Sequence, residues 1–313
     1  MSNQTDISIL LIGYQRTETI ATILDSALKN GVSNVLVSID APRIVDAISL
    51  ENSRRLKDIV SSYGTKFNFM ETRFLETNLG CALHVLKSID WAFERVSELV
   101  ILEDDCLPSD GFFNFVREGF SIMRSQPEIS LICGTQHAPS NLSDQRYYKS
   151  KFALTWGWAT TKSKWEEIKL GMIELNNPVP LHLCNLDPER IYWQEGSRRA
   201  IDGFVDVWDT PLVNFLFTNE KFSLLPKSNL VSNVGNDSLA THMRGEKKWL
   251  FQDVTEYDYA PPVEALFNTA ADEWLSHNFY GIRQRHLITT RITRIRDKFK
   301  KSSRSNLISR WLQ

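Results

Sequence analysis

An acidic triplet, Glu103-Asp104-Asp105, directly follows an apolar run of four residues, and a fourth acid, Asp40, closes another apolar run. Adjacent carboxylates repel one another, and a bound divalent cation would relieve that repulsion. Carboxylates that hold Mg²⁺ or Mn²⁺ usually supply one or two ligands and leave room for substrate phosphates. The triplet therefore indicates either a metal-dependent site for a phosphate-containing substrate or a solvated acidic turn.

The segments around these acids predict an α/β fold. Apolar runs rich in β-branched residues predict strands, and apolar positions at helical spacing predict helices between them. This β-α-β-α order is typical of a doubly wound, mostly parallel, Rossmann-like sheet. Ligands of such sheets bind outside the carboxyl ends of the strands, so Asp40 and the triplet should face one crevice. The expected strands are 7–12, 35–39, 66–70, 99–102 and 129–133, and the expected helices are 17–29, 48–62, 81–96 and 111–124.

The pattern changes after residue 135. Residues 139–150 are polar and predict a loop, residues 152–208 are dense in aromatic side chains, and residues 222–234 predict a strand with turns. No repeat or low-complexity linker separates the parts. We expect residues 1–135 and 136–281 to be two halves of one continuous core, followed by a basic tail at 282–313.

That tail is amphipathic. The formal net charge of the chain is -2, but residues 283–310 carry +9 and the rest carries -11. Ile288, Ile292, Ile295 and Phe299 would share one helical face, and a second apolar group follows at 307–312. We expect residues 283–312 to bind an anionic membrane surface. The alternatives are a helix docked on the acidic body, a disordered tail and nucleic-acid binding; no nucleic-acid motif occurs elsewhere, so nucleic acid is not an expected partner.

The composition limits the classes of protein to which the chain can belong. At 313 residues, 42% hydrophobic and 24% charged, the chain is in the usual globular range. It has no apolar run of about 18 residues that would span a membrane. The N-terminus lacks the pattern of a signal peptide, and the four cysteines have no metal-type spacing. We therefore expect a cytoplasmic protein with reduced thiols, peripheral at the inner membrane face.

The segment Leu99–Phe113 resembles the GT-A nucleotide-sugar glycosyltransferases, specifically the N-acetylglucosaminyltransferase I-like branch and its bacterial relatives. In this segment the acidic triplet is followed by a proline and an aromatic helix start, as in the family's variant of the Asp-x-Asp motif. The resemblance extends over residues 7–245. Its other segments are 13–16 with 38–40, 78–81, 89–93, 155–158, 207–209 and 229–242.

The resemblance implies an enzyme of the hexosyltransferase or N-acetylhexosaminyltransferase class. Such an enzyme is metal-dependent and inverting, and it moves a sugar from a UDP-sugar to a hydroxyl of a glycan acceptor. With the basic tail, the acceptor would be lipid-linked, which suits biosynthesis of a surface polysaccharide or lipopolysaccharide. Residues 1–135 would bind the nucleotide sugar, and residues 136–281 would bind the acceptor and hold the catalytic base.

Donor-side roles are also implied by the resemblance. Asp105 would bind Mn²⁺, or Mg²⁺ in its place, and His242 would lie near the metal or the diphosphate. The remaining donor residues would contact the nucleotide or the sugar. Glu103 and Asp104 would contact the donor sugar or ribose, Asp40 the uracil and Arg16 the nucleotide. Asn78 would also bind on the donor side; the alternative is that it mainly shapes a turn and caps the next helix.

On the acceptor side, the resemblance makes Asp209 the general base, with Asp206 as the alternative. A carboxylate within reach of a hydroxyl removes its proton as the new bond forms, and displacement from the opposite face inverts the anomeric centre. Trp156 and Trp158 could stack on sugar rings or belong to the core.

Two other functions compete. A sugar nucleotidyltransferase also uses a nucleotide, Mg²⁺ and acids on an α/β sheet, but Gly13–Arg16 is a poor match to its glycine-rich phosphate loop. A catalytically inactive homologue that binds nucleotide sugars or carbohydrate would carry the same motifs. A receiver-like signalling domain is too short to account for residues 140–280.

Overall fold

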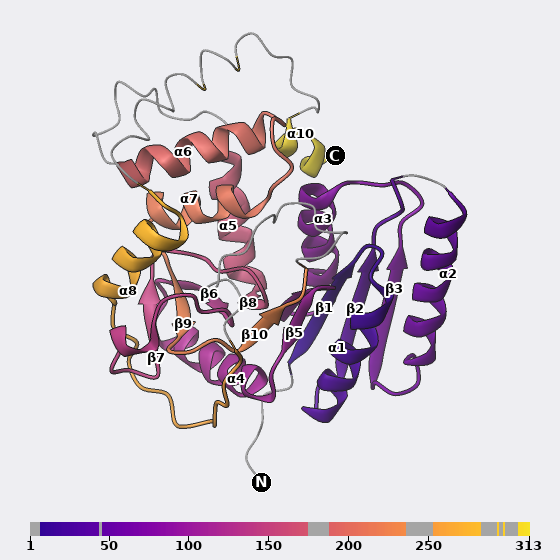
Figure 1. The fold of residues 1–313 in the computed structure, drawn as a ribbon, viewed down its shortest axis with the longest axis horizontal. Coiled ribbons are helices and arrows are strands. Elements are labelled where there is room, and N and C mark those ends of the chain that lie inside the picture. The colour runs from indigo at the N-terminus through magenta and orange to yellow at the C-terminus, as the bar shows by residue number, and fades with distance from the viewer. Residues whose placement is uncertain are drawn as a thin grey trace.

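The computed structural model describes residues 7–43, 46–174, 188–235, 253–282, 293, 297 and 306–313. Its centre is an eight-stranded sheet in the order β3-β2-β1-β4-β8-β6-β9-β7 (Figure 1). Six of these strands run in one direction, and β8 and β7 run against them. The expected mostly parallel, doubly wound α/β sheet is therefore confirmed. In sheet order the strands are Phe69–Phe74, Asn34–Ile39, Ser8–Gly13, Glu98–Glu103, Trp158–Thr161, Ile129–Cys133, Phe222–Pro226 and Tyr147–Ser150.

A second, two-stranded antiparallel sheet lies next to the acidic triplet. It pairs β5 (Cys106–Pro108) with β10 (Val231–Asn233). The segment after the triplet is therefore held by a part of the chain more than 120 residues away, which fixes its course across the ends of the strands.

Helices cover both faces of the large sheet, because successive residues of each strand point to opposite sides and both sides are apolar. In β1, Ile9 and Leu11 belong to one hydrophobic cluster, while Leu10 and Ile12 belong to the other. The first face is covered by α1 (Thr17–Lys29), α2 (Ala47–Ser62) and α4 (Asp110–Ser125). The second face is covered by α3 (Cys81–Phe93), α5 (Lys162–Glu174), α6 (Pro188–Ile201), α7 (Asp209–Thr218), α8 (Thr269–Trp274) and α10 (Leu307–Leu312).

Most elements lie where the sequence predicts them, with two corrections. The strand expected at 66–70 is β3 at Phe69–Phe74, and the loop expected at 139–150 contains the short helix η1 (Ser140–Leu142) and β7. Tyr147 and Tyr148 of β7 are both buried although the strand is polar in composition. Their hydroxyl groups explain this, because Tyr148 accepts a hydrogen bond from Gln136 at 2.6 Å and Tyr147 donates one to the Val263 carbonyl at 2.9 Å.

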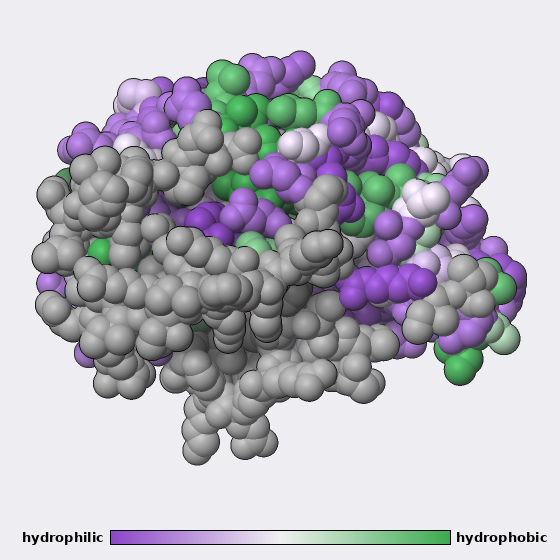
Figure 2. All heavy atoms as spheres, turned by 90° about the horizontal axis from the view of Figure 1, so that it is seen from above, coloured by the Kyte–Doolittle hydropathy of each residue, from purple (hydrophilic) through white to green (hydrophobic). Residues whose placement is uncertain are grey.

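The described surface is mostly polar because most apolar side chains point inward. Most described side chains on the face seen from above are hydrophilic; the largest apolar area lies in the upper middle of the view, with smaller ones to its right (Figure 2). Within the described residues, no helix is long and apolar enough to cross a bilayer. The three described cysteines, Cys81, Cys106 and Cys133, are free thiols.

The C-terminal helix α10 packs on the body of the protein, beside α3 and α6 (Figure 1). Its side chains Leu307, Ile308 and Trp311 are buried in the same cluster as the strand residues. This apolar group is thus unavailable to a membrane, and the docking alternative holds for this segment. The predicted amphipathic face at 288–299 lies outside the described residues, so membrane binding through 283–305 stays a prediction.

Asp90 of α3 joins three helices at this contact. Its carboxylate accepts hydrogen bonds from the indole N–H groups of Trp165 and Trp311, both at 2.7 Å, and pairs with Lys169 at 2.6 Å. The two indole rings lie 5.7 Å apart. One carboxylate therefore ties α5 and α10 to α3.

Replacing Asp90 with alanine should lower the free energy of unfolding by about 2–3 kcal/mol, because two indole donors and an ammonium lose their acceptor. Urea titration followed by tryptophan fluorescence measures this. The matched control is Asp58→Ala, which removes an exposed ion pair with Arg54 on α2 and should change stability little. Equal effects of the two substitutions would contradict the role of Asp90.

Candidate functional site

Two adjoining cavities lie at the carboxyl ends of the strands. The first cavity, of about 350 Å³, is lined by Gly13–Arg16, Asp40, Asn78 and His84. The second cavity, of about 320 Å³, is lined by Trp156, Asp209 and aromatic side chains from the C-terminal half. Among the described residues, four line both cavities and form the wall between them: Arg16, Cys81, Glu103 and Asp105. The expected crevice at the strand ends is present, and it has two chambers.

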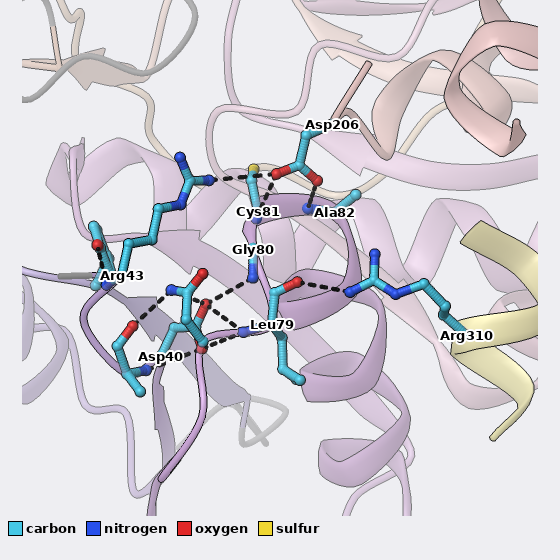
Figure 3. A network of polar contacts seen from close by, with 11 residues as sticks. Asp40, Arg43, Leu79, Gly80, Cys81, Ala82, Asp206 and Arg310 are labelled. Atoms are coloured by element: carbon cyan, nitrogen blue, oxygen red, sulfur yellow. Dashed lines mark hydrogen bonds and ion pairs between the residues drawn. The ribbon is translucent and has the colours of Figure 1, made fainter. Parts of the chain in front are cut away.

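Asp40 organises one side of the first cavity. Its buried carboxylate accepts hydrogen bonds from the backbone N–H groups of Ala41, Leu79 and Gly80 at 2.9–3.1 Å, and from the Asn78 amide at 3.1 Å (Figure 3). Burial raises the pKa of Asp40, while these N–H donors oppose the rise. The residue predicted to contact uracil is thus first of all the anchor of the turn at 78–80.

Asn78 supports the same turn. Its amide nitrogen also donates to the Ala41 carbonyl at 2.6 Å, which ties the turn to the end of β2. Gly80 has φ 81°, in the left-handed region that glycine adopts without strain. The turn therefore leads directly into α3 at the wall between the cavities.

Asp206 lies at the start of α3, across from this turn. Its carboxylate accepts hydrogen bonds from the backbone N–H groups of Cys81 and Ala82, both at 3.2 Å, and pairs with Arg43 at 3.4 Å (Figure 3). A carboxylate at a helix N-terminus satisfies free N–H groups and favours the helix dipole. The alternative general base therefore serves as a cap supplied by a distant segment.

The three acids of the triplet diverge in the structure. Asp104 points toward the turn after β1, where it accepts a hydrogen bond from Tyr14 N–H at 2.7 Å. Burial raises the pKa of Asp104 to about 6. Asp105 pairs with Arg16 at 3.2 Å at the wall between the cavities. Within the triplet, Asp104 therefore mainly holds the turn after β1 by accepting this hydrogen bond.

Gly235 is required beside Asp105. A Cβ atom at this position would lie 2.2 Å from Asp105 Oδ2, so a larger residue would displace the carboxylate. The Gly235 carbonyl also accepts a hydrogen bond from Arg16 at 3.4 Å. Gly235, in the segment 229–242 singled out in the sequence, thus lies directly beside the acid predicted to bind metal.

Glu103 stands between the two cavities. Within the described part of the chain its carboxylate accepts no hydrogen bond, in contrast to Asp104 and Asp105. Burial raises the pKa of Glu103 well above its usual range, and the negative charges of Asp105, Asp104 and Asp209 raise it further. A carboxylate in this position gains from any ligand that brings positive charge or a hydroxyl donor.

The acids fit a divalent cation, although no group of three or more His, Cys, Asp or Glu side chains among the described residues is arranged to hold one. Oxygen donors suit Mg²⁺ and Mn²⁺, and a nucleotide-bridged ion needs one or two carboxylates from the protein. Asp105 lines both cavities, and within the described residues its ion pair is with Arg16. His242, the second predicted ligand, lies outside the described residues.

Aromatic side chains form the far side of the second cavity. His137 stacks on Phe279 with ring centroids 4.3 Å apart and meets Trp156 edge-on at 5.2 Å. The ring centroid of Tyr280 lies 4.6 Å from that of Phe279. Flat apolar faces beside polar groups suit a sugar ring. Trp156 lines this cavity, and its contact with a sugar stays a prediction.

For Trp158, the core position holds of the two alternatives that the sequence left open. It is buried in the core, stacked on Trp208 at 5.5 Å, and lines neither cavity. Gly157, with φ 70°, turns the chain between the two tryptophans, so one faces the cavity and the other the core.

Asp209 is the first residue of α7 and lines the second cavity. Its negative charge raises the pKa of Glu103, Cys81 and Tyr280, although burial is the larger cause for all three. Its Oδ1 accepts a hydrogen bond from Thr210 at 3.4 Å. Asp209 thus lines only the second cavity, whereas Asp40 lines only the first.

His84 is a functional candidate that the sequence did not reveal. It lines the first cavity from α3, one helical turn after Gly80. Ser38 Oγ accepts hydrogen bonds from Ser88 at 2.8 Å and Arg73 at 3.2 Å, so its own proton is left for His84 Nε2 at 3.0 Å. This assigns the imidazole proton to Nδ1. Burial and Arg73 lower the pKa of His84 to about 3, so the ring is a neutral donor.

No signal in the sequence separated His84 from the apolar face on which it lies, between Leu83 and Val85. His137, Phe279 and Tyr280 were missed for a different reason, since they come from segments with no motif of their own. Arg43, which lines the first cavity, was also missed.

Comparison with known proteins gives limited information. No family model matches the chain, and no curated protein matches it. Similar solved structures include UDP-glucose pyrophosphorylase in complex with UDP-glucose, at 8% identity and a TM-score of 0.37, covering 71% of this chain and 91% of that chain. Another is described as a glucose-1-phosphate thymidylyltransferase from Bacillus anthracis in complex with sucrose, at 13% identity and a TM-score of 0.38, covering 78% and 99%. Likeness at this level does not identify the reaction, which has to be inferred from the site.

Asp104 makes stability depend on pH. Its folded pKa of about 6 exceeds its ordinary value of 3.8, so the folded state binds the proton more tightly. The wild-type protein should therefore lose up to about 3 kcal/mol through this group as pH rises from 4 to 7, and Asp104→Asn should not. Urea titrations of both proteins at each pH test this. A stability difference that is constant between pH 4 and pH 7 would contradict the buried position of Asp104.

Proposed function

We propose that the chain is a metal-dependent, inverting glycosyltransferase that uses a nucleoside diphosphate sugar, with UDP as the nucleotide. The supporting observation is the pair of cavities that share one wall of Arg16, Glu103 and Asp105, with Asp209 in the second cavity. A donor and an acceptor can then occupy separate chambers and meet at that wall. The acceptor is a glycan hydroxyl; a lipid-linked acceptor rests on the basic tail and stays a prediction.

The first cavity suits the nucleotide. Its polar lining includes the hydrogen-bonded pair Asp40 and Asn78, the ion pair Arg16 and Asp105, and His84. A fixed Nδ1–H of His84 can donate to a carbonyl oxygen of a base, and it would meet the amino group of cytosine unfavourably. The guanidinium group of Arg16 can bind phosphate oxygens.

The transfer step needs charge stabilisation on one side of the wall and a base on the other. As the sugar–phosphate bond breaks, negative charge grows on the diphosphate, and Arg16 lies beside it to stabilise that charge. A Mn²⁺ or Mg²⁺ ion held by Asp105 would add to that stabilisation. Asp209 accepts the proton of the acceptor hydroxyl while its oxygen bonds to the anomeric carbon. Attack from the second cavity, opposite the leaving group, inverts the configuration.

A sugar nucleotidyltransferase is the second candidate. Arg16 and Arg43 both line the first cavity, and two guanidinium groups suit a row of phosphates. In that reaction a sugar phosphate attacks the α-phosphate of a nucleoside triphosphate and releases pyrophosphate. The attacking oxygen is already anionic and needs no base, so Asp209 in the second cavity would have no proton to accept. The presence of Asp209 therefore favours glycosyl transfer.

Substitutions at the wall separate binding from chemistry. Asp209→Asn should lower the turnover of a UDP-sugar about 10²–10⁴-fold, since a general base is lost, with UDP affinity unchanged. Asp105→Ala should remove the increase in UDP affinity that Mn²⁺ produces. Calorimetry and a UDP-release assay measure these effects, and Asp144→Asn, an exposed acid, is the control. Normal turnover in Asp209→Asn would rule out its role, and binding without turnover in the wild type would identify an inactive homologue.

His84 should set nucleobase preference. His84→Ala should weaken UDP binding about 5- to 20-fold and CDP binding much less, because the lost N–H donor pairs with a carbonyl of uracil. Competition calorimetry gives both affinities. His277→Ala, an exposed histidine on η3 (Leu275–Phe279), is the matched control. An unchanged ratio of UDP to CDP affinity would contradict base recognition by His84.

A further inference from the structure

The peptide bond between Leu79 and Gly80 links the first cavity to the end of the chain. On the cavity side, its N–H group, that of Gly80, donates to Asp40 Oδ2 at 3.1 Å. On the opposite side, its carbonyl, that of Leu79, accepts a hydrogen bond from the Arg310 guanidinium at 3.2 Å. Figure 3 shows Arg310 of α10 and Asp40 reaching the same turn.

A peptide unit hydrogen-bonded at both ends is polarised, and each bond strengthens the other. Here the two outer partners carry full and opposite charges, a guanidinium on the carbonyl and a carboxylate on the N–H group. Asp40 also accepts hydrogen bonds from Leu79 N–H and the Asn78 amide. The turn is therefore bound by Asp40 on its cavity side and by Arg310 on the opposite side.

The helix that carries Arg310 is itself firmly held. At six residues, α10 is too short to be stable alone, so its geometry depends on docking. Trp311, the next residue, donates to Asp90 at 2.7 Å, and Lys169 lies 4.8 Å from the centre of its ring. Asn306 caps the helix by accepting a hydrogen bond from Ser309 N–H at 3.1 Å. Arg310 therefore starts from a fixed backbone.

We propose that Arg310 is a positioning residue for nucleotide binding, which holds the turn at 78–80 in the shape that the first cavity requires. Arg310 itself lines neither cavity, so it acts through the Leu79 carbonyl. The proposal rests on the proposed function for the identity of the nucleotide. It assigns the C-terminal helix a role in the donor site, through a carbonyl that is 231 residues earlier in the sequence than Arg310.

The test compares Arg310→Ala with Arg310→Lys and with Arg54→Ala, an arginine whose ion pairs are exposed on α2. Arg310→Ala should raise the KM for a UDP-sugar and the Kd for UDP about 5- to 20-fold, with kcat within about two-fold of wild type. Arg310→Lys should restore part of the affinity because it keeps a charged donor. Arg54→Ala should match the wild type.

Hydrogen exchange separates this proposal from the proposed function, because it needs no nucleotide. In Arg310→Ala the amides of residues 78–82 should exchange faster, while the peptides of β1 and β4 and the thermal midpoint stay unchanged. Unaltered exchange at 78–82 would overturn the proposal even if UDP binds. Faster exchange there in a wild-type-like fold that binds no UDP would support the positioning and contradict the choice of nucleotide. A global loss of protection in both Arg310 variants would show a merely structural role and overturn the proposal.

Discussion

An excess of negative charge at the end of β4 is the constraint on which the rest of the site depends. Glu103, Asp104 and Asp105 leave the sheet together, and Arg16 is the cation that the structure places beside them. The surrounding groups compensate the charges of the three acids to different degrees. Asp104 accepts a hydrogen bond from Tyr14 N–H, Asp105 pairs with Arg16, and Glu103 is half-buried and accepts no hydrogen bond within the described residues. Such an arrangement costs stability and is retained where a ligand needs it.

Around this excess charge, distant segments supply the fixed parts. Asp40 holds the turn at 78–80, Asp206 caps α3, and Arg310 binds the outer side of the same turn. Each contact uses a charged side chain on a backbone group, which is stronger than a neutral hydrogen bond. The second cavity is instead shaped by stacked aromatic rings, which fix its walls by packing.

The sequence predicted the parts of the fold and site that depend on local pattern. Apolar runs located β1, β2, β4 and β6, and the acids at their ends were correctly placed at one crevice. The predicted roles of Asp40 and Asp206 did not include turn anchoring and helix capping, because those partners are about 40 and 125 residues away. Trp156 and Trp158 look alike in sequence, and the φ of Gly157 sends them to different sides. His84 became a candidate once Ser38, Arg73 and Ser88 were seen around it.

The central claim is that the shared wall divides a sugar donor from a hydroxyl acceptor, so the bond between sugar and phosphate is the one that breaks. Phosphorus NMR of the protein with diamagnetic Mg²⁺ and a panel of UDP-sugars observes that bond directly. The account predicts that UDP accumulates, slowly with water and faster with a glycan acceptor, and that added pyrophosphate produces no UTP. Formation of UTP and sugar 1-phosphate from UDP-sugar and pyrophosphate, without release of UDP, would contradict it.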